Sequence, residues 1–218
     1  RMGLTDSVDY VIPGAEQAKI LVPKDTVTIS RMAYGYSVEM SPLQTVMFYN
    51  AIANNGKMVA PMLVKEIRSN GETIKTFETT VVKNSICGSQ TLEDIKTCLH
   101  DVVWDNNLGT ASVYKWKGHI AKYKAQSQLV PIAGKTGTAQ VMENGRYYSN
   151  KHRMSFVGYF PEDAPQYSCI CVIHGPRNKG LYDAGMDCGS VVRHIAEKTM
   201  AYTNEYVLQN GNLVFKNK

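Results

Sequence analysis

Three apolar segments in the second half of the chain constrain the fold most strongly. They span about residues 132–141, 154–160 and 167–173, and their length and composition are typical of strands. The loops between them carry Asn144-Gly145 and a proline-containing run at 161–165, which are turn sequences that join antiparallel neighbours. The third segment is almost continuously apolar, which predicts a central strand. We therefore expect a short antiparallel sheet.

Three helices are expected beside this sheet. The segment Ser41–Gln44 offers an N-cap serine, a proline at the first helical position and a capping-box glutamine, and Gly56 follows where the apolar period ends. Thr91 caps a second helix, and a third covers about 189–202. Helices packed on an antiparallel sheet give an α/β fold of the α+β type.

Two hairpins and an irregular entry complete the pattern. Strand-like residues flank Asn70-Gly71 within 64–77 and Asn210-Gly211 within 206–215, and such dipeptides favour two-residue hairpin turns. Residues 1–30 are broken by prolines and are expected to be irregular.

Length and composition exclude several classes of protein. The chain has 218 residues, 44% of them hydrophobic and 20% charged, which indicates one large globular domain or slightly more and excludes disorder. No window approaches the roughly 18 uninterrupted apolar residues of a membrane span, and no signal peptide is visible. The start Arg1-Met2-Gly3 indicates a piece of a longer protein.

The net charge of +5 is concentrated in one stretch. Residues 106–142 contain no acidic residue and five lysines, namely Lys115, Lys117, Lys122, Lys124 and Lys135. Tyr114, Trp116 and Tyr123 lie among them, as in some nucleic-acid-binding segments. A solvated lysine loop and an anion-attracting rim around a site are the other interpretations.

Cysteine and histidine give no sign of a metal site. The five cysteines form no Cys-x-x-Cys pair and their number is odd, and the histidines are at least 19 residues apart. Cys169 and Cys171 alternate within an apolar run, so they share one face of a strand and are interpreted as small buried hydrophobic residues.

One segment, Ala133–Gln140, carries a Gly-Lys-Thr triplet that two mechanisms use. A phosphate-binding P-loop needs a glycine where Leu129 stands, and Pro131 removes a backbone amide of that loop. The triplet also follows strand-like residues and opens no helix. We therefore reject the P-loop interpretation.

The second mechanism is the Lys-Thr-Gly signature of penicillin-recognising serine acyltransferases. On a strand beside a cleft, Lys135 places an ammonium where a substrate carboxylate can bind. Thr136 and Gly137 point to alternate faces, and the missing Cβ of Gly137 allows a ligand to approach the backbone. Thr138 offers a hydroxyl to the carboxylate, an amide to an oxyanion hole and a carbonyl to a substrate amide.

The wider context resembles the C-terminal part of the transpeptidase domain of class B penicillin-binding proteins, nearest to the division-associated monofunctional subgroup. The resemblance covers roughly residues 2–202. It rests on Tyr34-Gly35-Tyr36 with Ser41-Pro42-Leu43-Gln44, on Gly109-Thr110-Ala111, on AGKTGTAQ, and on Ser155–Pro161 after the Asn144-Gly145 turn. The segment 116–130 is longer and richer in lysine than is usual there, and Tyr182-Asp183-Ala184-Gly185 stands where a Gly-Gly pair is common.

This resemblance implies a fold, an activity and a set of partners. The fold is the penicillin-binding and β-lactamase-like transpeptidase fold, incomplete here, with an entry at 1–30, the signature sheet and helices at 31–204 and a tail at 205–218. The family's Ser-x-x-Lys and Ser-x-Asn precede residue 1, so no catalytic residue is expected in this chain. Lys135, Thr136, Gly137 and Thr138 would bind the substrate or penicillin.

In the complete protein, the family implies an upstream serine that attacks a D-Ala-D-Ala stem peptide and is also acylated by β-lactams. The family further implies no metal or organic cofactor and no nucleic acid. It implies a tether to the cytoplasmic membrane with the domain on the extracytoplasmic side, and as partners a membrane glycosyltransferase and proteins of division or elongation.

One other Ser-x-x-Lys occurs in the chain, at Ser112 to Lys115. On a helix the two side chains would share a face, as a lysine-activated serine requires. We interpret it as accidental, because it lies only 23 residues before Lys135 and no Ser-x-Asn separates the two.

Two other functions remain open. A β-lactamase or a β-lactam-sensing receptor uses the same fold, and the rate of deacylation separates either one from a transpeptidase. A non-catalytic module that binds an anionic polymer through the lysine-rich stretch would show steep salt dependence.

Overall fold

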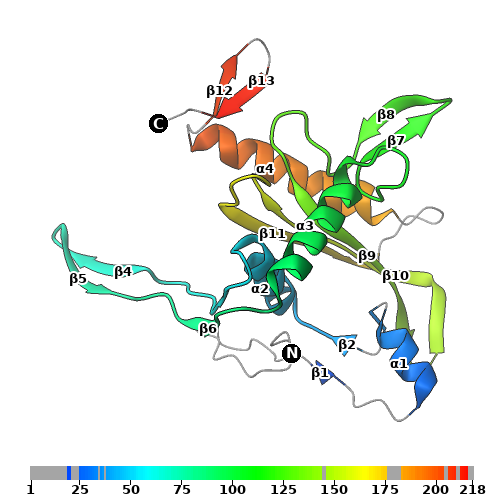
Figure 1. Ribbon diagram of the computed structural model, residues 1–218, viewed down its shortest axis with the longest axis horizontal. Coiled ribbons are helices and arrows are strands. Elements are labelled where there is room, and N and C mark those ends of the chain that lie inside the picture. Colours follow the sequence, from blue (N-terminus) through cyan, green and yellow to red (C-terminus); the bar gives the residue numbers. More distant parts are fainter. Residues whose placement is uncertain are drawn as a thin grey trace. The chain divides into compact units, whose positions relative to one another are not determined.

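The computed structural model describes residues 19–20, 25–33, 35–36, 38–143, 146–175, 183–203, 206–209 and 212–215 (Figure 1). The chain divides into two compact units, residues 1–92 and 93–218. Outside the described residues lie most of the entry segment before residue 25, Tyr34, the Asn144-Gly145 turn, Tyr182 and the Asn210-Gly211 turn.

The first unit is built from helices and short antiparallel strand pairs. In the part that the structure describes, its helices are α1 (Thr26–Met32) and α2 (Pro42–Ala53), and α3 (Ser89–Trp104) begins at its end. Its strands pair as β1 with β2, β3 with β6 and β4 with β5. They are β1 (Lys19–Ile20), β2 (Val38–Glu39), β3 (Met58–Val59), β4 (Glu66–Ser69), β5 (Glu72–Thr76) and β6 (Val81–Lys83).

Local sequence signals account for the two clearest elements of this unit. The capping box of α2 is formed as predicted, because Ser41 Oγ accepts from Gln44 N at 3.2 Å and Gln44 Oε1 accepts from Ser41 N at 3.3 Å. The hairpin β4–β5 turns at Asn70 and Gly71, whose φ angles of 51° and 86° are those of the predicted turn type. Helix α1 differs from expectation, since it begins at Thr26 inside the segment predicted to be irregular.

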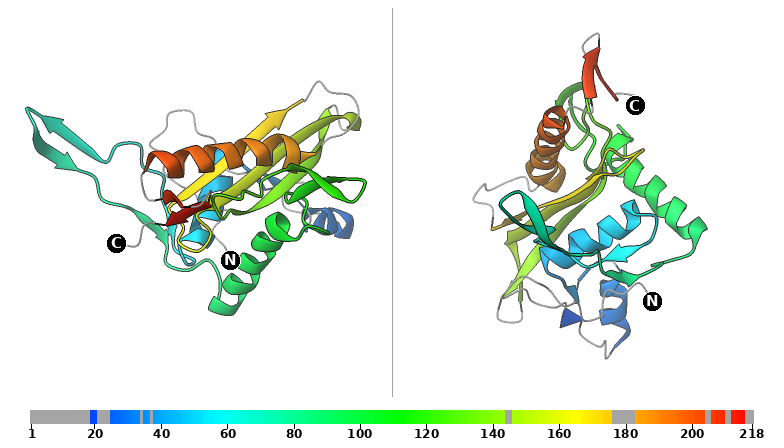
Figure 2. Two further views of the ribbon diagram at one scale, coloured as in Figure 1. Left: turned by 90° about the horizontal axis from the view of Figure 1, so that it is seen from above. Right: turned by 90° about the vertical axis from the view of Figure 1, so that its left-hand side faces the viewer.

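The second unit contains the predicted three-stranded antiparallel sheet. Its strands are β9 (Ala133–Glu143), β10 (Arg146–Phe160) and β11 (Tyr167–His174), in the order β11-β10-β9. Helix α4 (Ser190–Tyr202) follows the π-helical turn η1 (Gly185–Gly189) and contacts β10 and β11 along one face of the sheet (Figure 2). Two hairpins complete the unit, β7 (Val113–Trp116) with β8 (His119–Tyr123), and β12 (Tyr206–Gln209) with β13 (Asn212–Phe215).

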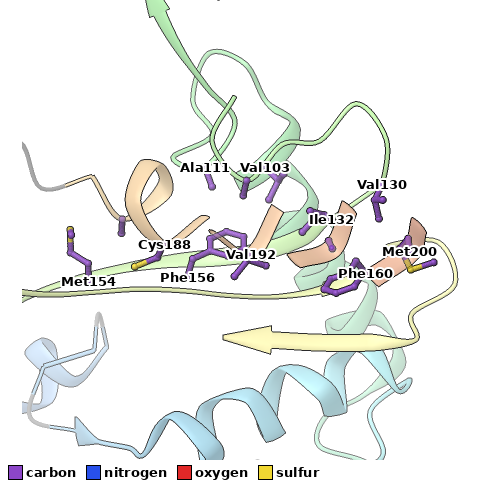
Figure 3. Packing of buried hydrophobic residues seen from close by; sticks show 13 residues of the cluster. Val103, Ala111, Val130, Ile132, Met154, Phe156, Phe160, Cys188, Val192 and Met200 are labelled. Carbon is purple, nitrogen blue, oxygen red and sulfur yellow. The ribbon is translucent and has the colours of Figure 1, made fainter. Parts of the chain in front are cut away.

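The core of this unit lies between the sheet and α4. Met154, Phe156 and Phe160 alternate along one face of β10 and are almost fully buried (Figure 3). They pack with residues of α4, η1, α3 and the approach to β9, among them Val192, Met200, Cys188, Val103, Val130 and Ile132. Burying aromatic and aliphatic side chains stabilises the sheet by roughly 1.5–3 kcal/mol each. This core packs against one face of the sheet and includes Ile132, so it also holds the residues that lead into β9.

Two predictions about this unit were wrong or incomplete. The apolar run 167–173 was expected to be central, yet β10 is the central strand of the described sheet and β11 lies at its edge. Cys169 and Cys171 on β11 are accordingly half-buried and not fully enclosed. The hairpin β7–β8 had no counterpart in the prediction, although Lys117 and Gly118 at its tip have φ angles of 49° and 81°.

Candidate active site

The signature residues lie in the middle of β9, at the edge of the described sheet. Thr136 and Thr138 stand opposite Phe156 and Met154, so the two threonines lie on the same face of the strand. Lys135 and Gly137 occupy the alternate positions and belong to the other face. An edge strand leaves a row of peptide groups available to a further chain. The prediction of a strand at about 132–141 is confirmed, and in the described sheet this strand lies at an edge.

The ammonium of Lys135 is close to the strand that carries it. Lys135 Nζ donates to the backbone oxygen of Thr136 at 3.0 Å, and the residue as a whole remains exposed. Partial burial of the ammonium lowers the pKa of Lys135 below its ordinary value. Among the described residues no carboxylate forms an ion pair with it. The strand thus presents a partly desolvated cation whose present partner is a neutral carbonyl.

Gly137 keeps the backbone of β9 bare beside the lysine. A Cβ placed at this position would come within 2.6 Å of Ser155 Oγ on the neighbouring strand. A larger residue would therefore have to displace the Ser155 hydroxyl. Because glycine has no side chain, the backbone of β9 is uncovered at this position and a ligand can approach it closely.

Thr136 has a side-chain partner outside the sheet. Its Oγ1 lies 2.7 Å from Oγ1 of Thr110, a residue in the turn between α3 and β7. Thr138 is exposed two positions further along β9. Thr110 was expected only to belong to a family-like turn, because a contact across 26 positions leaves no local signal in the sequence.

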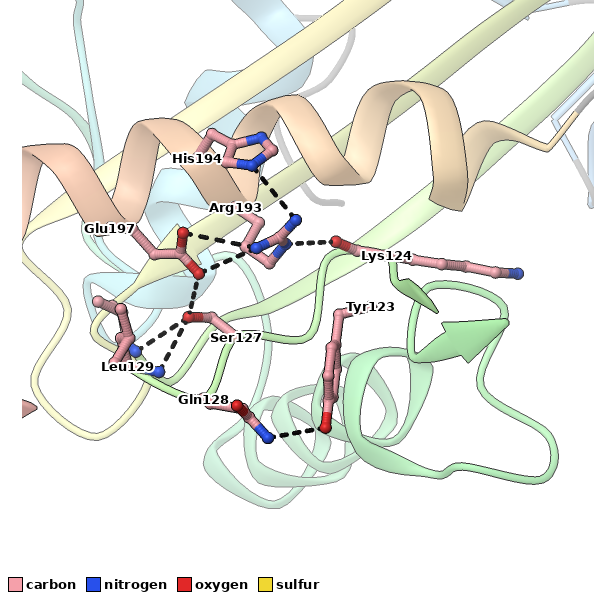
Figure 4. A network of polar contacts seen from close by, with 9 residues as sticks. Tyr123, Lys124, Ser127, Gln128, Leu129, Arg193, His194 and Glu197 are labelled. Carbon is pink, nitrogen blue, oxygen red and sulfur yellow. Dashed lines mark hydrogen bonds and ion pairs between the residues drawn. The ribbon is translucent and has the colours of Figure 1, made fainter. Parts of the chain in front are cut away.

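The lysine-rich approach to β9 is fastened to α4 by a polar cluster (Figure 4). Ser127 Oγ donates to Glu197 at 2.7 Å and accepts from the amides of Leu129 and Val130. Arg193 donates to Glu197 at 3.2 Å and to the backbone oxygen of Lys124 at 3.0 Å. A hydroxyl that bonds two amides and a carboxylate fixes the loop that leads into the signature strand.

The second Ser-x-x-Lys is not a catalytic pair. Ser112 is buried, with 1% of its surface exposed, and its hydroxyl donates to Gly109 O at 3.0 Å. Lys115 lies on strand β7 and donates to Asn107 Oδ1 at 3.2 Å. The segment is a strand and not the helix that a lysine-activated serine needs.

The lysine-rich stretch has a mixed role in the structure. The side chain of Lys124 is only 12% exposed and forms an ion pair with Asp183 at 2.8 Å. Lys117 and Lys122 lie on the exposed hairpin β7–β8. Lys115 and Lys124 therefore bond to groups elsewhere in the fold, and Lys135 bonds to its own strand, which weakens the interpretation of the stretch as a polymer-binding strip.

A cavity of about 420 Å³ lies away from the signature residues. It is lined by Lys96, Thr97, His100, Pro131, Tyr159, Glu162 and Asp163. His100 Nδ1 and Glu162 Oε1 approach to 2.7 Å, and burial raises the pKa of Glu162. No residue from Lys135 to Thr138 lines this cavity, so the candidate site is the open edge of β9.

Comparison with a family model decides the family. The model of the penicillin-binding protein transpeptidase domain matches residues 2–200. The chain belongs to this family. The resemblance stated from the motifs is thereby confirmed, and Lys135-Thr136-Gly137 lies within the matched region.

Named relatives agree with this assignment. Stage V sporulation protein D of Bacillus subtilis is 27% identical over 147 residues, covering 66% of this chain and 20% of that protein. Penicillin-binding protein PbpB of Mycolicibacterium smegmatis is 25% identical over 201 residues, covering 90% of this chain and 30% of that protein. This transpeptidase-family chain therefore spans between a fifth and three tenths of the length of these relatives.

Solved structures confirm the predicted fold class. Penicillin-binding protein 3 of Mycobacterium tuberculosis, complexed with aztreonam, superposes with a TM-score of 0.73 at 22% identity, covering 100% of this chain and 47% of that chain. Penicillin-binding protein 2B of Streptococcus pneumoniae gives a TM-score of 0.72 at 22% identity, covering 95% of this chain and 32% of that chain. Within the described residues, no helix has both the length and the apolar character of a membrane span.

Proposed function

We propose that residues 1–218 are the C-terminal part of the transpeptidase domain of a peptidoglycan D,D-transpeptidase. The observation that carries this proposal is the position of Lys135–Thr138 on the edge strand β9, where an ammonium, two hydroxyls and bare backbone lie within four consecutive residues. The family match over residues 2–200 supports it independently. The nucleophilic serine and its lysine and asparagine companions belong to the segment preceding residue 1.

The proposed reaction proceeds in two acyl transfers. The upstream serine attacks the carbonyl carbon between the two terminal D-alanines of a stem peptide, and the last D-alanine leaves with a proton on its amine. An amine of a neighbouring stem peptide then attacks the serine ester, which forms the cross-link and returns the serine hydroxyl. A β-lactam acylates the same serine by opening of its ring amide.

Residues of this chain bind and orient the substrate in both steps. Lys135 attracts the terminal carboxylate, and Thr136 and Thr138 donate hydrogen bonds to it. Because the ammonium of Lys135 is partly desolvated, its attraction for an anion exceeds that of a fully hydrated lysine. The amide of Thr138 serves an oxyanion hole, and its carbonyl pairs with the substrate as an added strand would.

The same function implies a cellular location and partners for the whole protein. The domain acts on the extracytoplasmic side of the membrane, held by an N-terminal tether, with a membrane glycosyltransferase and division or elongation proteins as partners. The names of the relatives, a sporulation protein and a penicillin-binding protein among them, favour this setting.

The test uses the full-length parent protein and a fluorescent penicillin. We expect a covalent adduct that persists for many minutes, together with release of D-alanine from a synthetic stem peptide when an acceptor amine is present. Rapid hydrolysis of the adduct with turnover of the drug would identify a β-lactamase instead. A stable adduct without release of D-alanine would identify a β-lactam-sensing receptor.

A further inference from the structure

The hydroxyl of Thr136 is held by a neighbour that the family motif does not include. Thr110 Oγ1 lies 2.7 Å from Thr136 Oγ1, within the ordinary range for two hydroxyl oxygens. Thr110 precedes the buried Ala111 in the turn that leaves α3, so it approaches β9 from outside the sheet. Either oxygen is able to donate in the absence of a ligand.

The backbone of Thr110 is itself fixed from two other elements. Lys124 Nζ donates to Thr110 O at 3.1 Å and forms an ion pair with Asp183 Oδ2 at 2.8 Å. Gly185, in the turn η1, packs so closely that a Cβ on it would collide with the same carbonyl oxygen. The next residue is fastened as well, since Ala111 N donates to Val102 O at 2.9 Å. Thr110 is therefore a rigid support and not a freely moving loop residue.

An anionic ligand determines which of the two hydroxyls donates. A hydroxyl has one proton to donate and two lone pairs to accept with, whereas a carboxylate only accepts. Once Thr136 donates its proton to a carboxylate, the hydrogen bond to Thr110 persists only if Thr110 donates and Thr136 accepts. Hydrogen bonds arranged in such a chain polarise one another, so the donation by Thr110 strengthens the donation by Thr136.

We propose that Thr110 is a positioning residue that orients the Thr136 hydroxyl toward the carboxylate of the substrate or β-lactam. This inference rests on the proposed function, because it requires Thr136 to bind that carboxylate. Thr110 acts through Thr136 and does not touch the ligand. Lys124, Asp183 and Gly185 hold Thr110 in place.

The test measures second-order acylation rates of the full-length parent protein and four variants, Thr110→Val, Thr110→Ser, Thr136→Val and the double valine variant. Valine has nearly the shape of threonine but lacks the hydroxyl. We expect Thr110→Val to slow acylation by penicillin roughly three- to tenfold, which is the value of one ordinary hydrogen bond. Thr110→Ser keeps the hydroxyl and should restore most of the rate.

Two further readouts separate positioning from a general structural effect. In the double variant, the loss should be close to that of Thr136→Val alone, because Thr110 has no effect once its partner hydroxyl is gone. Penicillin methyl ester lacks the anion, so Thr110→Val should slow its reaction much less than that of the free acid. Thr97→Val is the matched control, since the Thr97 hydroxyl donates to Glu93 O within α3 and should leave both rates unchanged.

The outcomes distinguish this inference from the proposed function. Three results would overturn the positioning role even if the parent protein forms its adduct. They are an equal loss of acylation rate with the acid and the ester, additive losses of rate in the double variant, and no loss of rate in Thr110→Val. Absence of any adduct in the unmodified parent protein would overturn the proposed function itself. Should Thr110→Val lower the melting temperature, the acid-to-ester ratio still decides, because a folding defect reduces both reactions alike.

Discussion

Two segments of the second unit each combine a lysine with a hydroxyl residue, and the fold differs in how far it buries the hydroxyl. In the first, Ser112 is buried against Gly109 and Lys115 is bonded to Asn107. In the second, Lys135 and Thr136 lie on an edge strand, where the ammonium of Lys135 is partly desolvated and, among the described residues, bonded to a carbonyl of its own strand. A catalytic or binding motif therefore depends on which of its groups the fold leaves available, and spacing in sequence does not determine this.

The strongest test of this comparison uses the 218-residue chain by itself. In the proposed function the Lys-Thr-Gly strand orients a carboxylate but supplies no nucleophile, and the members of such a catalytic group act together. We expect no stable adduct between the chain and a fluorescent penicillin in a denaturing gel, while the parent protein gives one. Labelling that disappears in Ser112→Ala would reverse the roles of the two segments.

Removal of each lysine is the next test. In the parent protein, Lys135→Ala should slow acylation by about 10- to 100-fold, because a hydrogen bond to a charged group is worth about 1.5–3 kcal/mol. Lys115→Ala removes an exposed contact and should leave the rate unchanged. Stopped-flow acylation rates check both, and thermal melting shows whether the variants are folded. If the two substitutions changed the acylation rate equally, the edge strand would not be the part that recognises the carboxylate.

The decline of the acylation rate at alkaline pH should report the loss of charge on Lys135. Burial lowers the pKa of its ammonium, so the positive charge is complete below that pKa and disappears as the pH rises through it. Lys135→Arg remains charged throughout the accessible range, and its acylation rate should decline at a higher pH than that of the unmodified protein. A pH profile that is identical in both proteins would assign this decline to another group.

The smallest expected effect concerns Ser112. Ser112→Ala removes a buried hydrogen bond to Gly109 O and should lower the free energy of unfolding by about 1 kcal/mol. The rate of acylation in the parent protein should not change. Urea unfolding and acylation measured on the same preparation test the two statements together. A slower reaction without a loss of stability would show that Ser112 takes part in the chemistry.

Sequence predicted the elements whose determinants are local. The capping box at Ser41 and the turn at Asn70-Gly71 each depend on a few adjacent residues, and both formed as expected. The three strands of the sheet were also located, because apolar runs between turn residues are a local pattern. The signature segment on β9 was found in the same way, through its motif.

Properties that depend on neighbours distant in sequence were not predictable. The apolar composition of β11 does not distinguish a central strand from an edge strand with both faces half-buried, so its position in the sheet was wrong. The hairpin β7–β8 turns at Lys117-Gly118, a sequence less distinctive than Asn-Gly. The contact between Thr110 and Thr136 joins two segments that only the tertiary fold brings together.

The polar cluster around Ser127 bears on the order in which the parts of the protein fold. Ser127 and its partner Glu197 are 70 positions apart, so the loop leading into β9 receives its anchor from a helix near the far end of the chain. A ribosome completes the signature strand well before it completes α4. Contacts between distant segments form late, after the entropy of closing the intervening loop has been overcome. The edge of β9 that carries the signature is therefore expected to acquire its final geometry as one of the last events of folding, after α4 has emerged and docked.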